Sequence, residues 1–97
     1  MALQIVINKR FAVKVVQISE YLENEWSAKV AEEFLLKVDK KIFLIANKPE
    51  IGSPALKGTR KLFLTKRNKI YYRVKGKKVI FVSLFETKQN PQRNKYE

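Results

Sequence analysis

The stretch RKLFLTKRNKIYYRVKGKKVIFVSLF, residues 60–85, decides the fold, because three strand-like runs follow one another with almost nothing between them. The runs are RKLFLTK (60–66), KIYYRVK (69–75) and KVIFVSLF (78–85). Each is rich in β-branched and aromatic residues, which favour strands. The connecting pairs, RN and GK, have the length of tight hairpin turns, and Asn68 and Gly76 can adopt the positive φ that such turns often need. The stretch therefore predicts a three-stranded antiparallel meander.

Alternation along the middle run assigns its side chains to two faces of the sheet. Ile70, Tyr72 and Val74 point one way, and we expect them to meet the helices. The opposite face carries Lys69, Tyr71, Arg73 and Lys75. The last run is apolar on both faces, as expected of an interior strand, so the N-terminal strand ALQIVI (2–7) is placed beside it, in a direction that the sequence leaves open.

Between these strands the apolar period becomes that of helices. Phe11, Val15, Ile18 and Leu22 fall on one helical face, which predicts a helix from Lys9 to about Glu25. Ser27 is a typical N-cap for a second helix, whose apolar stripe runs from Ala31 to Ile45. So short a link predicts an antiparallel hairpin of helices. NKPEIGSP (47–54) then ends the second helix, because its prolines lack the backbone donor, and Ile51 is a candidate anchor.

Residues 1–97 are therefore expected to form a single α+β domain. Its predicted architecture is an N-terminal strand and an antiparallel helix hairpin packed on one face of a mainly antiparallel four-stranded sheet. A 45% share of hydrophobic residues is sufficient for a core of its own.

Composition excludes several classes of site. The chain has no Cys and no His, so disulfides, thiolate zinc sites and histidine acid–base chemistry are absent, and we expect neither a cofactor nor a metal. There is no glycine-rich phosphate loop and no nucleophile elbow. No run is long enough to span a membrane and the N-terminus does not resemble a signal peptide, so a cytoplasmic location is expected.

The net charge of +12 is unevenly distributed along the chain. Residues 1–56 hold eight Lys and Arg against seven Asp and Glu, whereas residues 57–97 hold thirteen against two. Such a basic half attracts polyanions. The alternative is a basic surface that keeps the protein soluble and has no dedicated ligand, and charge alone does not decide between them.

The basic face of the meander is the strongest candidate site. Lys61 and Phe63 are expected beside the basic residues of the middle run, with Lys66 and Arg67 at the turn. Cations hold phosphates, and aromatic rings stack on unpaired bases, so single-stranded RNA suits this pattern. A lysine crowded by cations can act as a base on the 2′-hydroxyl of RNA, while arginine stabilises the transition state. Exposed lysines also solubilise sheets, and equally dense cations occur in proteins that catalyse no reaction.

The order of segments, together with AEEFLLKVDKKIFLIANKPEIGSP (31–54) and RKLFLTKRNKIYYRVKGKKVIFVSLFETKQNP (60–91), resembles the RelE/ParE superfamily of bacterial type II toxin–antitoxin modules, also known from plasmid stabilisation. The resemblance covers nearly the whole chain. It implies a cognate antitoxin whose acidic or amphipathic segment wraps the helix hairpin and the basic sheet. It also implies one of two targets: RelE-like members cleave mRNA on the ribosome without a metal, and ParE-like members inhibit DNA gyrase.

The resemblance also assigns candidate residues. Candidate catalytic residues of a metal-independent endoribonuclease are Lys61, Lys66, Arg67, Lys69, Arg73 and Lys88. Candidate nucleic-acid-binding residues are these six together with Phe63, Tyr71 and Gln89. Lys69 stands where nuclease members have an arginine, and their C-terminal general acid has no aligned counterpart, although Tyr96 is near. The alternative function is a non-toxic basic RNA-binding or adaptor domain.

Overall fold

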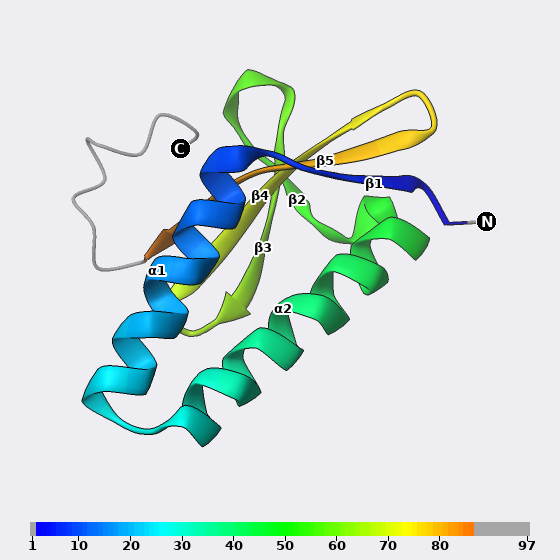
Figure 1. Ribbon diagram of the computed structural model, residues 1–97. Helices are drawn as coiled ribbons and strands as arrows, with labels where there is room; N and C mark the ends of the chain where they lie inside the picture. The colour runs from blue at the N-terminus through cyan, green and yellow to red at the C-terminus, as the bar shows by residue number, and fades with distance from the viewer. Residues whose placement is uncertain (1, 87–97) are drawn as a thin grey trace.

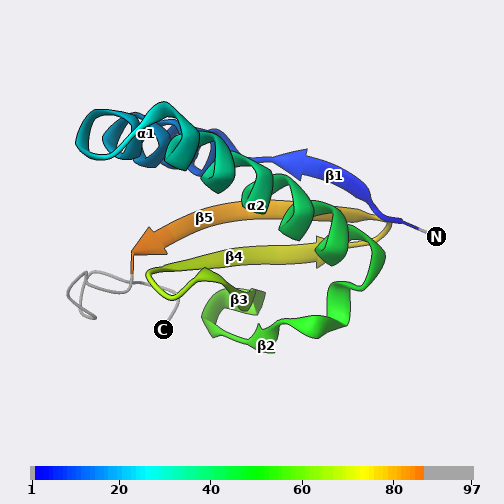
Figure 2. The same cartoon turned by 90° about the horizontal axis from the view of Figure 1, so that it is seen from below.

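A helix hairpin and a five-stranded sheet make up the computed structural model, which describes residues 2–86 (Figure 1). In chain order the elements are β1 (Gln4–Ile7), α1 (Lys9–Glu25), α2 (Ala28–Asn47), β2 (Ser53–Pro54), β3 (Arg60–Thr65), β4 (Asn68–Lys75) and β5 (Lys78–Glu86), with 3-10 turns at η1 (Pro49–Ile51) and η2 (Leu56–Gly58). Both helices lie on one side of β4 and β5, and β3 and β2 form the edge of the sheet that is farthest from the helices (Figure 2). The predicted combination of a helix hairpin on a sheet is confirmed.

The sheet differs from the prediction in its number of strands. Its order is β1-β5-β4-β3-β2, with β1 parallel to β5 and all other neighbours antiparallel. The four-stranded sheet that the sequence predicted is therefore wrong, since Ser53 and Pro54 add a fifth strand by pairing with Lys61 and Arg60. Two residues are too few to show a period, and a proline is tolerated in an edge strand. The N-terminal strand lies beside the last one, as predicted.

Each helix begins at a side-chain cap, which the sequence predicted for Ser27 but not for Asn8. The side chain of Asn8 accepts a hydrogen bond from the Arg10 amide at 3.4 Å, and Ser27 Oγ accepts one from the Val30 amide at 3.2 Å. Their apolar stripes and the inner face of the sheet form the main core, whose largest buried members are Phe11, Phe34, Ile45, Ile70, Tyr72 and Phe81. Val74, expected on this core face, is 42% exposed instead.

Tyr72 fixes the exit loop of α2 to the sheet. Its hydroxyl donates to the Pro49 carbonyl at 2.7 Å and accepts from the Gly52 amide at 2.9 Å. The Arg60 guanidinium adds a bond to the Gly52 carbonyl at 2.6 Å, and Ile51 packs against the core, as predicted. Burial raises the pKa of the Tyr72 phenol above its usual value of 10.0. A Cβ on Gly52 would overlap the Tyr72 hydroxyl, so this position requires glycine.

Candidate functional site

The outer face of the sheet, turned away from the helices, brings together several predicted site residues. The strand register aligns Phe63 with Lys69, and Lys69 with Phe85, while Lys61 lies opposite Tyr71. Directly opposed residues share a face of the sheet. The Lys69 ammonium lies 5.4 Å from the centre of the Phe63 ring, within the range of a cation–π interaction. The predicted mixture of cations and an exposed ring is therefore present at Lys61, Phe63 and Lys69.

Tyr71 departs from the prediction that it would offer a stacking surface, because its side chain is fully buried. It forms a second, smaller core with Val82, packed against Ala55, Ile80 and Phe85. The rings of Tyr71 and Phe85 meet edge to face, with centres 5.6 Å apart and planes at 88°. The expected exposure of Tyr71 is wrong, and no base can stack on its ring in this conformation.

An irregularity in the sheet contributes to this burial. The register between β4 and β5 shifts at Tyr71 and Tyr72, which pair with Ser83 and Phe81, so that Val82 is the extra residue of a bulge. The sequence carried one signal of this second core. The last strand is apolar on both faces, and its outer side chains had to be covered by something other than the helices.

Arg73 also contacts its own chain. Its guanidinium donates to the Lys57 carbonyl at 2.8 Å, and Lys57 itself has a positive φ of 61° within η2. The residue thus ties the η2 turn to β4. A guanidinium used in this way holds the loop that carries Ala55 over Tyr71.

The turn between β3 and β4 carries two further predicted residues, Lys66 and Arg67, both exposed. Thr65 Oγ1 organises this turn by accepting from the Arg67 amide at 3.1 Å and from Asn68 Nδ2 at 3.0 Å. Asn68 was expected to be able to take a positive φ within the turn. It instead begins β4 without one, and its side chain is buried. Lys88 and Gln89, the remaining predicted residues, lie outside the described residues.

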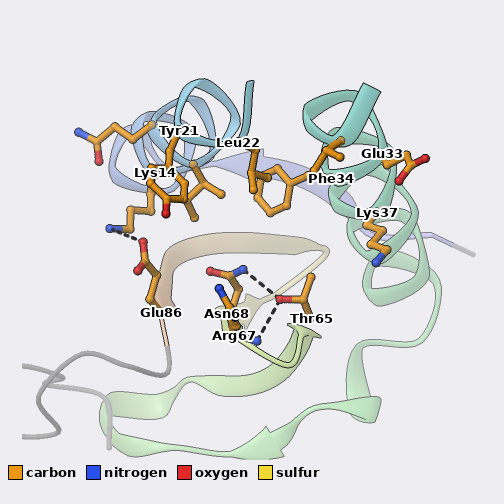
Figure 3. A pocket seen from close by; sticks show the side chains of 13 residues that line it. Lys14, Tyr21, Leu22, Glu33, Phe34, Lys37, Thr65, Arg67, Asn68 and Glu86 are labelled. Carbon is orange, nitrogen blue, oxygen red and sulfur yellow. Dashed lines mark hydrogen bonds and ion pairs between the residues drawn. The ribbon is translucent and has the colours of Figure 1, made fainter. Parts of the chain in front are cut away.

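A cleft of about 670 Å³ lies beside this turn, between the helix hairpin and the sheet (Figure 3). Its floor is apolar and consists of Ile18, Leu22, Val30 and Phe34. Its remaining lining residues are polar or charged, apart from the Tyr21 ring, and include Lys14, Lys37, Arg67, Glu33, Glu86, Thr65 and Asn68. Lys14 on α1 and Glu86 at the end of β5 form an ion pair at 3.6 Å on one side of the cleft.

Sequence reasoning missed this cleft. Its walls come from α1, α2, the β3–β4 turn and the end of β5, and no local pattern shows that these four segments meet. Only Arg67 among its lining residues was a predicted site residue. Asn68 was noted for its backbone alone, and its sequence neighbours Arg67 and Lys69 give no sign that its side chain is buried.

Two other kinds of site receive no support within residues 2–86. No group of three or more acidic side chains is arranged to hold a metal ion there. Neither α1 nor α2 combines the length and the apolarity that a membrane-crossing helix needs.

The sequence matches the family model described as "ParE toxin of type II toxin-antitoxin system, parDE" over residues 5–91. A comparison with curated proteins gives no match.

Solved structures of toxins share the fold. A chain of the chromosomal ParDE system from P. aeruginosa has a TM-score of 0.76 at 15% identity, over 88% of this chain and 96% of that one. The YoeB/ParE toxin from Agrobacterium tumefaciens has a TM-score of 0.60 at 15% identity, over 86% and 97%. A mutant of E. coli toxin RelE in the free state has a TM-score of 0.59 at 17% identity, over 91% and 86%.

Proposed function

The chain belongs to the ParE toxin family of type II toxin–antitoxin systems, and from this premise we propose that it arrests growth by inhibiting DNA gyrase until a cognate antitoxin neutralises it. The observation that carries the proposal is the match over residues 5–91, which includes the whole basic meander. Gyrase inhibition is the activity that resemblance to ParE-like members implies. We also propose that residues 1–97 form a single toxin domain.

The state of the outer face favours a protein target over RNA cleavage. Tyr71 is buried in the second core, and the Arg73 guanidinium is bonded to the Lys57 carbonyl. Two of the residues expected to contact nucleic acid are thus engaged in contacts within the protein. The exposed Phe63 ring beside Lys69 suits a protein–protein contact, in which one aromatic anchor is flanked by charge.

The test is a supercoiling assay with purified gyrase and purified protein. We expect loss of supercoiling at stoichiometric amounts of the natural chain, and at least a tenfold weaker effect for Phe63→Ser combined with Lys69→Glu. Lys29→Glu, on the exposed start of α2, is the matched control and should inhibit fully. Normal supercoiling in a large excess of folded natural protein would contradict gyrase as the target.

Ribosome-dependent mRNA cleavage is the second candidate, because Lys61 and Lys69 share the outer face and the Lys66–Arg67 turn adjoins it. In that mechanism Lys61, Lys66, Arg67, Lys69, Arg73 and Lys88 would bind phosphate and assist attack by the 2′-hydroxyl, with Phe63 and Gln89 contacting bases. Mapping of mRNA ends after induced expression decides this candidate. Intact messages in growth-arrested cells would exclude it.

Neutralisation is tested by co-expression. A short neighbouring open reading frame with an acidic, amphipathic C-terminal half is the expected antitoxin gene, and its product should restore growth. Unimpaired growth of cells that produce the soluble protein alone would instead support the alternative, a non-toxic basic RNA-binding or adaptor domain.

A further inference from the structure

The hairpin that joins β4 to β5 gathers three lysines at one end of the sheet. Lys75 lies directly opposite Lys78 in the strand register, and Lys77 shares the two-residue turn between them with Gly76, whose φ is 61°. All three lysines are exposed. Figure 1 shows the hairpin, in yellow, projecting from the sheet beside the start of β1. We name Lys75, Lys77 and Lys78 the hairpin cations.

The η2 turn brings a fourth lysine to the same end of the sheet. Arg73 lies two residues before Lys75 and therefore on the same face of β4, and its guanidinium donates to the Lys57 carbonyl at 2.8 Å. Lys57 is exposed and has a positive φ of 61°, which is unfavourable for a residue other than glycine. The chain thus holds a strained lysine near the hairpin cations.

The charge of these lysines is not offset by acids. Residues 51–85 contain ten Lys and Arg and no Asp or Glu, and β1, which pairs with β5 beside the hairpin, has no charged residue. None of the hairpin cations forms an ion pair within residues 2–86. Like charges directly opposite each other on two strands are destabilising, so the Lys75–Lys78 pair lowers the stability of the hairpin. A bound polyanion would remove that repulsion, because phosphates would neutralise the lysines.

The side chains of the hairpin indicate which polyanion it suits. Proteins bind single-stranded nucleic acids largely by stacking unpaired bases on exposed aromatic rings. The hairpin sequence RVKGKK (73–78) has no aromatic residue, and the preceding rings of Tyr71 and Tyr72 are buried. The hairpin therefore offers charge alone. Charge alone favours duplex DNA over a single strand, because the two strands of the duplex carry more phosphates per unit length.

We propose that the hairpin cations and Lys57 bind the phosphate backbone of duplex DNA without reading its sequence. This contact is separate from the candidate gyrase contact at Phe63 and Lys69, because Lys69 is six residues, or about 20 Å, from Lys75 along β4. The choice of DNA as the polyanion rests on the proposed function, since gyrase acts on duplex DNA and a toxin bound to gyrase lies close to that DNA.

The experiment measures the affinity of the purified full chain for a short fluorescein-labelled DNA duplex by fluorescence anisotropy, over a series of salt concentrations. The hairpin variant replaces each hairpin cation by Gln. The helix variant is the matched control, because it loses the same three charges on α2, through Lys29→Gln, Lys37→Gln and Lys40→Gln. All six positions are exposed, so both variants should fold as the natural chain does.

The slope of log affinity against log salt concentration counts the phosphates that the protein contacts, at about 0.9 for each. We expect the slope to fall by about 2.7 in the hairpin variant and by about 0.9 in Lys57→Gln. The affinity of the hairpin variant should fall at least about tenfold at physiological salt. The helix variant should keep its slope within about 0.5 of the natural value. A single-stranded RNA with as many phosphates should bind the natural chain more weakly than the duplex.

Equal slopes for the natural chain and the hairpin variant would overturn the proposal. An equal loss in the helix variant would also overturn it, because net charge alone would then attract the DNA. Single-stranded RNA that binds as tightly as the duplex would overturn DNA as the ligand.

The supercoiling assay fails or succeeds separately from these titrations. Inhibition of gyrase by the natural chain, together with a slope that does not depend on the hairpin cations, would refute the DNA contact alone. A slope that depends on the hairpin cations, without inhibition of gyrase, would support the DNA contact and refute gyrase as the target.

Discussion

Two buried polar side chains on the same strand, Tyr72 and Asn68, differ in how their hydrogen bonds are completed. The Tyr72 hydroxyl both donates and accepts, because the loop after α2 folds against it. The Asn68 amide has one hydrogen-bond partner, Thr65 Oγ1, and its oxygen is buried without a partner among the described residues. The chain itself thus completes the hydrogen bonds of the Tyr72 hydroxyl, whereas it leaves the Asn68 oxygen without a partner within residues 2–86. The Tyr72 network therefore stabilises the fold, whereas the unpaired Asn68 oxygen costs it stability.

Gly52→Ala should cause the largest loss of stability, because it disrupts the hydrogen bonds between Tyr72 and the loop after α2. The new Cβ would overlap the Tyr72 hydroxyl and push the loop away from both of its hydrogen bonds. We expect a loss of about 3 kcal/mol in the free energy of unfolding, measured by urea denaturation. Ser53→Ala at the exposed neighbouring position should change it by less than about 0.5 kcal/mol. Equal values for the two variants would show that the loop tolerates the displacement.

Tyr72→Phe should have the next largest effect. It removes one hydroxyl and leaves the Pro49 carbonyl and the Gly52 amide without their partner. We expect a loss of about 2 kcal/mol at pH 7 in the same denaturation assay. A loss below about 0.5 kcal/mol would mean that water replaces the hydroxyl, and the Tyr72 hydrogen bonds would then not distinguish this position from Asn68.

The pH dependence of the difference in stability between the natural chain and Tyr72→Phe provides a second check. Burial raises the Tyr72 pKa above 10.0, so the folded state holds this proton more tightly than the unfolded state does. The stabilisation is therefore complete below about pH 10 and is lost as the pH rises toward the folded-state pKa. Phe cannot titrate, so the gap in stability between the natural chain and Tyr72→Phe should narrow above pH 10. A constant gap from pH 7 to pH 11 would contradict the raised pKa.

Most of the fold could be predicted from sequence because its elements are long enough to show a period. Both helices, the Ser27 cap and the three strands of the meander lie where the patterns indicated. β2 was missed since it has two residues and contains a proline. The parallel direction of β1 was left open, because strand direction depends on the path of the chain through two helices.

The candidate site was harder to predict, because alternation gives the face of a side chain but not what covers that face. Lys61, Phe63 and Lys69 are together as expected, whereas Tyr71 is covered by a loop and a bulge that no period reveals. The cleft requires four segments to meet, and only the tertiary fold brings them together. The roles of these residues in binding or catalysis stay predictions.

Asn68→Leu should change stability much less than Tyr72→Phe, although both positions are buried on one strand. The substitution loses the bond to Thr65, but it also removes the carbonyl oxygen that has no partner and adds apolar contact with the cleft floor. These effects oppose each other, and we expect a net change within about 1 kcal/mol in thermal or urea unfolding. A loss as large as that of Tyr72→Phe would show that the Asn68 amide stabilises the fold, and the contrast between Asn68 and Tyr72 would disappear.

Glu86→Gln should change stability least, because it removes only the exposed ion pair with Lys14 beside the cleft. Its carboxylate pairs with Lys14 at 3.6 Å while remaining 45% exposed, and exposed ion pairs contribute about 0.2–1 kcal/mol. A double-mutant cycle with Lys14→Met should give a coupling of about 0.3 kcal/mol at low salt that vanishes at about 1 M salt. A coupling well above about 1 kcal/mol would mean that the pair fastens α1 to β5. With a weak coupling, the Lys14–Glu86 pair contributes little to the stability of the fold.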